Sequence, residues 1–413
     1  MTNEIRAQFP FLQGTSPVMY LDNAATTQKP RVVIDTVSSF YSEGYGNISR
    51  GSHQFTRKTT AQYEHAREIL AQFIHATSSR EIMFTSGSTE SVNLIAACLL
   101  EKERAQQNKH TPRVIITTKI EHNSNLLPWQ QLEDSGLFRL MYTPLKADLT
   151  VDIQGLTEIT SKHPIAIVAI SHVSNVTGTI QPIRTISETV KRLHPEAVII
   201  TDASQSIGHM SINVEQLRTD VLFFSGHKMY GPTGSGVIYV KETVLADLAP
   251  YHVGGGMAKT VTDHDYEPKR YPSRFEAGTP NIEGALGLCA ACEWLDNLDR
   301  SKVLEHEVML ANNLRAQLEA LTVKGLAILG DKAADHSGIL SFYIKGLGSE
   351  DIANFLDDDG ICVRSGHHCT QLAHSTLFGI DSSVRVSYGV YNTEDDNNRL
   401  VQSLTKAVAL LSD

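Results

Sequence analysis

The chain lacks any long apolar run, and it has fewer basic than acidic side chains. No apolar stretch in its 413 residues is long enough to span a bilayer, and the first six residues show no secretory signal pattern. The 36 Lys and Arg side chains face 46 Asp and Glu, a formal net charge of -10. This acidic balance disfavours nucleic acid or an anionic membrane as the main partner. We therefore expect a cytoplasmic protein with no nucleic-acid or membrane partner.

Cysteine is also scarce, and its placement predicts neither a disulfide framework nor a metal site. The five cysteines are Cys98, Cys289, Cys292, Cys362 and Cys369, an odd number without regular spacing. Cys289 and Cys292 form a CxxC pattern, but they lie in an Ala- and Leu-rich stretch that is typical of a buried helix. No second Cys/His pair accompanies them, so no metal ligand set is predicted.

The pattern of apolar segments predicts a two-domain α/β protein. Short β-branched runs occur at 114–117, 165–170, 197–201, 221–224 and 236–240, and segments of helical periodicity such as 61–76 and 185–193 alternate with the strands. Strands without polar alternation are buried on both faces, which favours a mostly parallel sheet covered by helices. After about residue 285 the pattern changes to a long helix, 302–321, a strand, 339–344, and a closing helix. We predict a large domain at 20–285, and a smaller α+β domain formed by 1–19 and 286–413.

Polar residues follow several of the predicted strands. Ser88 and Thr89 precede a helix after one apolar run, and small hydroxyl residues there either cap the helix or bind an anion through its N-terminus. His122, Asn175, and Asp202 with Gln205 follow three further runs. A lone His or Asn after a strand usually caps a loop. Because ligands bind at the carboxyl ends of strands in open α/β sheets, four such sites together predict a ligand site.

A lysine stands in a turn between two apolar runs, in the segment Ser225-Gly226-His227-Lys228. Burial and nearby cations lower the pKa of a lysine and leave its amine nucleophilic. Enzymes that use pyridoxal 5′-phosphate (PLP) need such a lysine to bind the aldehyde of the cofactor. Lysines at strand ends are also common, so Lys228 alone leaves both interpretations open.

The motifs, taken in order, resemble those of the class V aminotransferase family of PLP enzymes. The resemblance runs from Tyr20 to Thr393. It is carried by Ser88-Thr89-Glu90, Glu121-His122, Ser174-Asn175, Asp202 to Gln205, Ser225 to Lys228, and Arg274 to Pro280. The segment from Val363 to Cys369 resembles the catalytic loop of Suf-type (group II) cysteine desulfurases. The resemblance implies the PLP-dependent transferase fold type I, with a mostly parallel seven-stranded sheet and a smaller α+β domain.

The resemblance also implies how PLP would be held. Lys228 would bind the cofactor covalently and move a proton, Asp202 would pair with the pyridine nitrogen, and His122 would stack on the ring and serve in acid–base steps. The remaining cofactor contacts would come from Gln205 and Asn175 near the phenolic oxygen, and from Ser88, Thr89, Ser225 and His227 at the phosphate. Thr279 would reach the phosphate in a neighbouring subunit, which implies a homodimer. No metal is implied.

The same resemblance implies the substrate, L-cysteine. Arg385 would clamp its carboxylate through a bidentate fork, near Asn175 and Arg364. Without the resemblance, Arg385 would be far more typical of a surface or structural ion pair. Cys369 would take the sulfur as a persulfide and leave L-alanine, supplying sulfur for iron–sulfur clusters or other sulfur compounds. His367, His368 and Arg364 could favour its thiolate. A buried, inert cysteine is the alternative, but the polar setting of Cys369 disfavours it, whereas Cys362 fits it.

The chain departs from the family pattern in two places. Thr370 to His374 stand where the family usually has Ala-Gln-Pro, and Ser49 stands where many members carry His. The short segment between Cys369 and Arg385 implies a sulfur-acceptor protein of SufE or SufU type. The alternatives are a selenocysteine lyase or another class V carbon–sulfur lyase, and a scaffold protein with the same fold.

Overall fold

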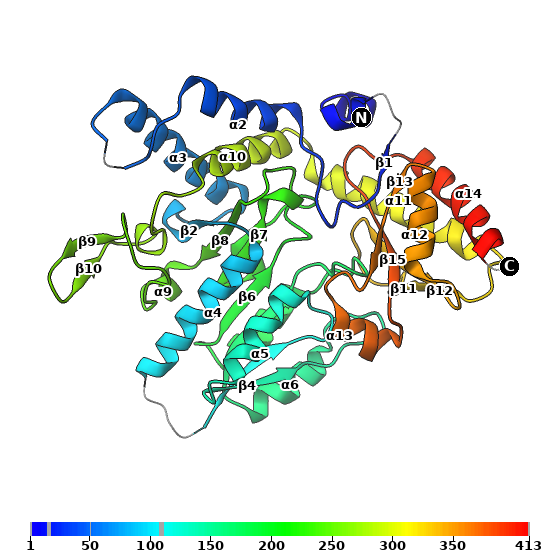
Figure 1. Ribbon diagram of the computed structural model, residues 1–413. Helices are drawn as coiled ribbons and strands as arrows, with labels where there is room; N and C mark the ends of the chain where they lie inside the picture. The colour runs from blue at the N-terminus through cyan, green and yellow to red at the C-terminus, as the bar shows by residue number, and fades with distance from the viewer. Residues whose placement is uncertain (1, 15–17, 50, 107–110, 412–413) are drawn as a thin grey trace.

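The computed structural model describes residues 2–14, 18–49, 51–106 and 111–411, and a seven-stranded sheet lies at its centre (Figure 1). The strand order is β2-β8-β7-β6-β5-β3-β4. The strands are β2 (Ile82–Thr85), β3 (Arg113–Thr117), β4 (Phe138–Tyr142), β5 (Ile165–Ser171), β6 (Val198–Asp202), β7 (Val221–Ser225) and β8 (Gly236–Val240). Only β8 runs antiparallel to its neighbours. The predicted mostly parallel α/β sheet is confirmed.

Both faces of this sheet are buried, as the unbroken apolar runs predict. Along β5, Ile167 and Ala169 join a core with helix α4, whereas Val168 and Ile170 join a second core with α6 and α7. The helices of this part are α4 (Ser88–Ala105), α5 (Leu127–Glu133), α6 (Ile153–Lys162), α7 (Ile183–Lys191), α8 (Val214–Leu217) and α9 (Glu242–Leu245). The edge strand β4 and the hairpin of β9 (Ala258–Val261) and β10 (Tyr266–Pro268) are elements that the apolar runs did not predict.

Three further helices form a layer beside the sheet (Figure 1): α2 (Arg31–Glu43), α3 (Gln54–Phe73) and α10 (Ile282–Asp296), and α10 packs against the other two. Cys289 and Cys292 lie buried in α10, so the helical interpretation of the CxxC pattern is confirmed. Helix α10 spans the predicted boundary at residue 285, and the division into domains stays a prediction.

The C-terminal part builds a second, four-stranded sheet with the order β11-β12-β15-β14. Its strands are β11 (Leu326–Leu329), β12 (Ile339–Ile344), β14 (Arg364–Gly366) and β15 (Ser383–Ser387), and its helices are α11 (Arg300–Ala320), α12 (Ser349–Asp358), α13 (Gln371–Ala373) and α14 (Glu394–Leu411). All its strand pairs are antiparallel, as expected for an α+β unit.

The N-terminal segment contacts both parts of the protein. After α1 (Thr2–Arg6), Phe9 packs edge-on against Trp294 and Tyr391 and lies beside Tyr230. Strand β1 (Met19–Tyr20) then pairs in parallel with β13 (Ile361–Cys362). The segment after β1 contacts both parts as well, because Asp22 forms a bridge with Ser387 of β15 and the Thr27 amide donates to the His227 carbonyl.

Candidate active site

The carboxyl ends of β2, β3, β5, β6 and β7 meet at one edge of the large sheet, because these strands run in the same direction. A cavity of about 220 Å³ lies there, between this edge and the β14–β15 end of the small sheet. Twelve of the thirteen predicted site residues line it: Ser88, Thr89, His122, Asn175, Asp202, Gln205, Ser225, His227, Lys228, Arg364, Cys369 and Arg385. Thr279 does not line it. It is exposed in the loop that precedes α10.

The turn that carries Lys228 is tightly fixed. Gly226 begins the 3-10 turn η4 (Gly226–Lys228), and a Cβ on it would come within 2.4 Å of the Ser235 hydroxyl. The carbonyl of His227 accepts bonds from the Thr27 amide at 3.0 Å and from the Lys29 ammonium at 3.0 Å. Burial lowers the pKa of Lys228 to about 8, against the opposing effect of Asp202. The amine is therefore available in neutral form far below the usual range for lysine.

Asp202 ends β6 and faces the cavity with a buried carboxylate. Its Oδ1 accepts from the Ser204 amide at 2.8 Å and from the Ser204 hydroxyl at 2.5 Å. Burial raises the pKa of Asp202, and these two bonds act in the opposite direction. A carboxylate in this position can hold a cationic nitrogen of a ligand.

The N-terminus of α4 forms a cradle of hydroxyl and amide groups. The Ser225 hydroxyl accepts from the Ser88 amide at 2.8 Å, and the Ser88 hydroxyl lies 2.7 Å from that of Ser204. Gly236 packs so closely that a Cβ there would lie 2.4 Å from Gly87 Cα, which keeps β8 against this turn. The helix dipole and these donors favour an anionic group.

His122 is neutral in this site. Its Nδ1 accepts a hydrogen bond from the Ser124 amide at 3.1 Å, so the ring proton lies on Nε2. Burial, together with the nearby cations Lys228, Arg385 and Arg364, lowers the pKa of His122 to about 3. The neutral ring is therefore available for stacking and as a hydrogen-bond donor through Nε2.

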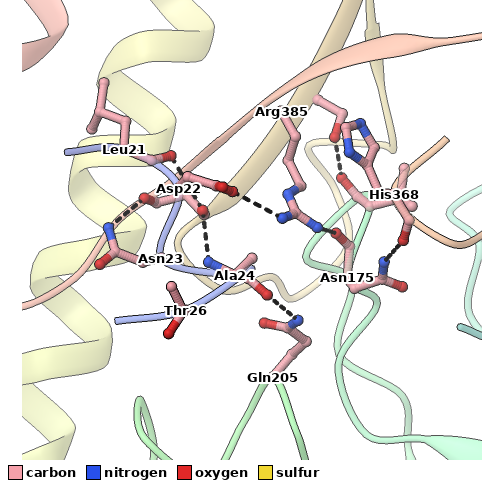
Figure 2. Close-up of polar contacts among 12 residues, drawn as sticks. Leu21, Asp22, Asn23, Ala24, Thr26, Asn175, Gln205, His368 and Arg385 are labelled. Atoms are coloured by element: carbon pink, nitrogen blue, oxygen red, sulfur yellow. Dashed lines mark hydrogen bonds and ion pairs between the residues drawn. The ribbon is translucent and has the colours of Figure 1, made fainter. Parts of the chain in front are cut away.

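Arg385 has a partner that the sequence did not reveal. Its Nη2 pairs with Asp22 Oδ1 at 3.1 Å and its Nη1 donates to the Asn175 carbonyl at 3.0 Å, as Figure 2 shows. Arg385 is only 2% exposed and Asp22 is 22% exposed. Burial lowers the pKa of Arg385 to about 10, so the cation persists at neutral pH. Two of its five N–H groups are used, and the others remain for a substrate carboxylate.

The Cys369 loop closes the cavity from the small-sheet side. His368 and Cys369 both have left-handed backbones, with φ of 53° and 57°. The Asn175 side chain donates to the His368 carbonyl at 2.8 Å (Figure 2), and the Asn123 amide donates to the Cys369 carbonyl at 2.7 Å. These bonds hold two strained residues in place and leave the Cys369 side chain exposed, as predicted for a reactive rather than a buried thiol.

Sequence reasoning gave no role to several residues at the cavity: Ala24, Ser124, Ser171, Ser204 and, as the Arg385 partner, Asp22. The serines follow strands or helix starts, and this position in the sequence is only a weak indication of a ligand site. Asp22 comes from a segment far from β15 in sequence, and only pairing of that segment with Ser387 brings it there. Ser49 is exposed and does not line the cavity.

Within the described ranges, no helix is both long and apolar enough to cross a membrane. Among the same residues, no group of three or more His, Cys, Asp or Glu side chains could hold a metal ion.

Comparison with known proteins places the chain among full-length relatives. The family model described as aminotransferase class-V matches residues 19–400. A probable cysteine desulfurase of Vibrio cholerae is 38% identical over 413 residues, with 98% of each chain covered. One from Halalkalibacterium halodurans is 39% identical over 407 residues, which covers 98% of this chain and 97% of the relative.

Solved structures give the same likeness. The apo cysteine desulfurase of Thermococcus onnurineus has a TM-score of 0.90 at 33% identity, covering 99% of this chain and 98% of the other. The Escherichia coli cysteine desulfurase CsdA, in an S-sulfonic acid form, also has a TM-score of 0.90 at 33% identity, covering 100% and 99%. The predicted fold class, PLP-dependent transferase fold type I, is confirmed.

Proposed function

Because the chain belongs to the aminotransferase class-V family, we propose that it is a cysteine desulfurase that converts L-cysteine to L-alanine and takes the sulfur on Cys369 as a persulfide. One observation carries the proposal. Lys228, Asp202, Arg385 and Cys369 come from four separate segments and line the same cavity. A lysine amine, a carboxylate, a carboxylate-binding fork and an exposed thiol are the groups that this reaction needs.

The residues at the cavity fit PLP. Gln205 Oε1 is buried without a partner among the described residues, and Lys228 has no ion pair there within 4.0 Å. The α4 cradle with Ser88, Thr89, Ser225 and His227 would hold the phosphate, and Asp202 the ring nitrogen. His122 would stack on the ring, with Gln205 and Asn175 near the phenolic oxygen. When bound, PLP supplies an electron-withdrawing ring that weakens the bonds at the substrate Cα and Cβ.

The chain's own groups then bind and orient the substrate. Arg385 offers its remaining N–H groups to the α-carboxylate, while its bonds to Asp22 and the Asn175 carbonyl keep the fork from rotating. Arg364, on the neighbouring strand β14 and opposite Arg385 in register, adds a second cation. Lys228, with its lowered pKa, accepts and returns the Cα proton, and the neutral ring of His122 offers a hydrogen bond from Nε2–H.

Cys369 performs the sulfur transfer. Its thiolate attacks the substrate sulfur, an S–S bond forms, and the Cβ–S bond breaks with its electron pair left on the substrate carbon. A proton then completes L-alanine. In sum, L-cysteine and the Cys369 thiol give L-alanine and the Cys369 persulfide, and a thiol reductant regenerates the enzyme by releasing sulfide.

The direct test is incubation with L-cysteine, PLP and a reductant. We expect alanine and sulfide in equal amounts, and loss of both in Cys369→Ala. Cys362→Ala is the matched control, because Cys362 is half-buried and does not line the cavity. If the Cys369→Ala variant still formed a persulfide and still turned over L-cysteine, the mechanism would be refuted.

The alternatives separate in the same assay. A selenocysteine lyase would act on L-selenocysteine and leave L-cysteine unchanged, and another carbon–sulfur lyase would keep its activity in Cys369→Ala. A scaffold protein would show no absorbance band with PLP that depends on Lys228. Lys228→Ala must abolish that band if the site works as proposed.

A homodimer and a sulfur acceptor complete the proposal. Tyr41 and Tyr45 are exposed and stack at 5.7 Å, and Val261 is exposed on the β9–β10 hairpin, so this side of the molecule offers apolar surface to a second copy. Thr279 lies in the loop that follows this hairpin, and we propose that it reaches the partner's phosphate site. Sedimentation should give a dimer, and Thr279→Ala should weaken PLP retention.

Four points stay predictions: membership of the Suf-type subgroup, an acceptor of SufE or SufU type, use of the sulfur in iron–sulfur cluster assembly, and a cytoplasmic location. Binding of a purified acceptor of either type to the persulfide enzyme, with transfer of labelled sulfur, tests the acceptor. No transfer to either type would refute this part of the proposal.

A further inference from the structure

A single hydroxyl joins two buried imidazoles beside the nucleophile. Ser383, at the start of β15, places its Oγ 3.0 Å from Nε2 of His368 and 3.0 Å from Nε2 of His374. His368 is adjacent to Cys369, and His374 begins a short π-helical turn (His374–Phe378). His374 belongs to the stretch in which the chain departs from the family pattern. The proposed function assigns no role to either His374 or Ser383.

The contacts fix which atom carries each proton. Nδ1 of His374 lies 3.0 Å from the Thr370 carbonyl, which can only accept, so Nδ1 is protonated. Burial lowers the pKa of His374, so the ring is neutral and its Nε2 accepts. The Ser383 hydroxyl has one proton and donates it to that Nε2. Ser383 Oγ therefore accepts from Nε2–H of His368.

This order leaves His368 in one tautomer. Its Nε2 carries the proton, and its Nδ1 is a bare acceptor that is buried without a partner among the described residues. The ring is 3% exposed and lines the cavity. The charged and titratable groups that face it are Arg385, His374 and Arg364, and burial together with these groups lowers the pKa of His368 to about 2. A protonated His368 would be a third cation beside the two arginines.

The same residues tie down the strained loop. Thr370 supplies the carbonyl that holds His374, and its hydroxyl donates to Asn175 Oδ1 at 3.1 Å. Asn175 in turn donates to the His368 carbonyl. At the backbone, the left-handed residues His368 and Cys369 are held by the bonds that their carbonyls accept from Asn175 and Asn123. At the side chain, the imidazole of His368 is held by the Ser383 hydroxyl. Loss of the side-chain bonds would release the Cys369 loop toward ordinary backbone geometry.

We propose that His374 and Ser383 are positioning residues for sulfur transfer: the Thr370–His374–Ser383–His368 chain of hydrogen bonds holds His368 in its Nε2–H tautomer and keeps the Cys369 thiol in place. The inference rests on the proposed function for its kinetic effect. The hydrogen-bond order itself does not depend on the reaction. This chain of hydrogen bonds positions the nucleophile Cys369 and not the guanidinium of Arg385 that binds the substrate carboxylate. Loss of these hydrogen bonds therefore slows sulfur transfer and leaves substrate binding unchanged.

Kinetics of the PLP-loaded enzyme test the proposal. His374→Phe and Ser383→Ala should each lower the first-turnover rate of alanine formation about 5- to 30-fold, the range expected for one or two lost contacts, with KM for L-cysteine unchanged. The double variant should be no slower than either single variant, because both act through one chain. His374→Gln, whose amide can still accept from Ser383, should recover part of the rate.

Ser375→Ala is the matched control, because the Ser375 hydroxyl bonds only within its own turn and is exposed. It should keep the full rate. Retention of the PLP absorbance band in every variant shows that the fold and the cofactor site persist. Unchanged rates in His374→Phe and Ser383→Ala, or additive losses in the double variant, would overturn the positioning role.

Nitrogen-15 NMR of histidine-labelled protein tests the proton order without turnover. Spectra of His368→Gln and His374→Gln assign the two rings. We expect the proton on Nε2 of His368 and on Nδ1 of His374, and a mixture of tautomers for His368 in Ser383→Ala. A proton on Nδ1 of His368 in the unmodified enzyme would refute the order. If the unmodified enzyme did not turn over L-cysteine, the proposed function would be wrong. The NMR spectra would still test the proton order independently of that result.

Discussion

The rate at which Lys228 reacts with PLP should depend on pH, because burial of the lysine lowers its pKa. The reaction needs a neutral amine, and burial brings the pKa of Lys228 to about 8. Roughly one lysine in ten is then neutral at about pH 7, whereas an exposed lysine of pKa about 10.4 would have fewer than about one in a thousand. The site therefore gains a factor of about two hundred in neutral, reactive amine at about pH 7.

The assay mixes protein freed of PLP with excess PLP and follows the absorbance band that forms with Lys228. The rate should rise about tenfold per pH unit below about pH 8 and level off above it. A rate that climbs without a plateau up to about pH 10 would refute the lowered pKa. Lys228→Ala gives the background, since its band should not form at any pH.

Asp202 supplies a second, independent test of the same reasoning. Its negative charge raises the pKa of Lys228 against the effect of burial. In Asp202→Asn the plateau should therefore begin at a lower pH than in the unmodified protein. Arg385→Lys is the matched control, because it keeps a positive charge in the site, and its plateau should move little. A shift of the Asp202→Asn profile to higher pH would contradict the electrostatic argument.

Three further predictions concern substrate binding and stability. Arg385→Lys should raise KM for L-cysteine about 10- to 150-fold, which is the effect of losing one charge-assisted bond of about 1.5–3 kcal/mol. Inhibition by a simple carboxylate should weaken in parallel. An unchanged KM would contradict the carboxylate clamp. Glu276→Ala should destabilise the protein by about 3–5 kcal/mol in denaturant unfolding, because it removes the two 2.8 Å bonds to buried Arg67 and leaves that cation only the exposed carboxylate of Glu64. Glu267→Ala, in an exposed pair, should cost far less. Against the effect of burial, the charge and hydrogen bonds of Glu307 raise the pKa of His209. This ion pair therefore contributes stability below the ordinary histidine pKa and loses it as pH rises through the raised value. Unfolding midpoints should fall with rising pH in that range more steeply than in the His209→Gln/Glu307→Gln double variant.

Much of the fold follows from local sequence. The β-branched runs at 165–170 and 221–224 lie within strands β5 and β7. They were recognisable because a strand buried on both faces needs no polar alternation. The half-buried edge strand β4 has a mixed pattern, and the exposed hairpin β9–β10 has almost no buried residue, so neither gave a clear signal.

Much of the candidate site was also predictable, for a topological reason. Parallel strands end at one edge, so residues that follow separate apolar runs, such as Asp202 and Lys228, must come together there. The role of Thr279 stays a prediction, because one chain alone does not bring it to its own cavity.

The sequence by itself determined the buried strands of the large sheet, the lysine turn and the family, since these depend on residue type and order along the chain. Only the tertiary structure decided which groups act on one another. Asp22 meets Arg385, and Ser383 joins His368 to His374, across separations that no local pattern encodes. Hydrogen bonds and pKa shifts depend on distances of a few ångströms and on burial, and these are set when the two sheets close around the cavity.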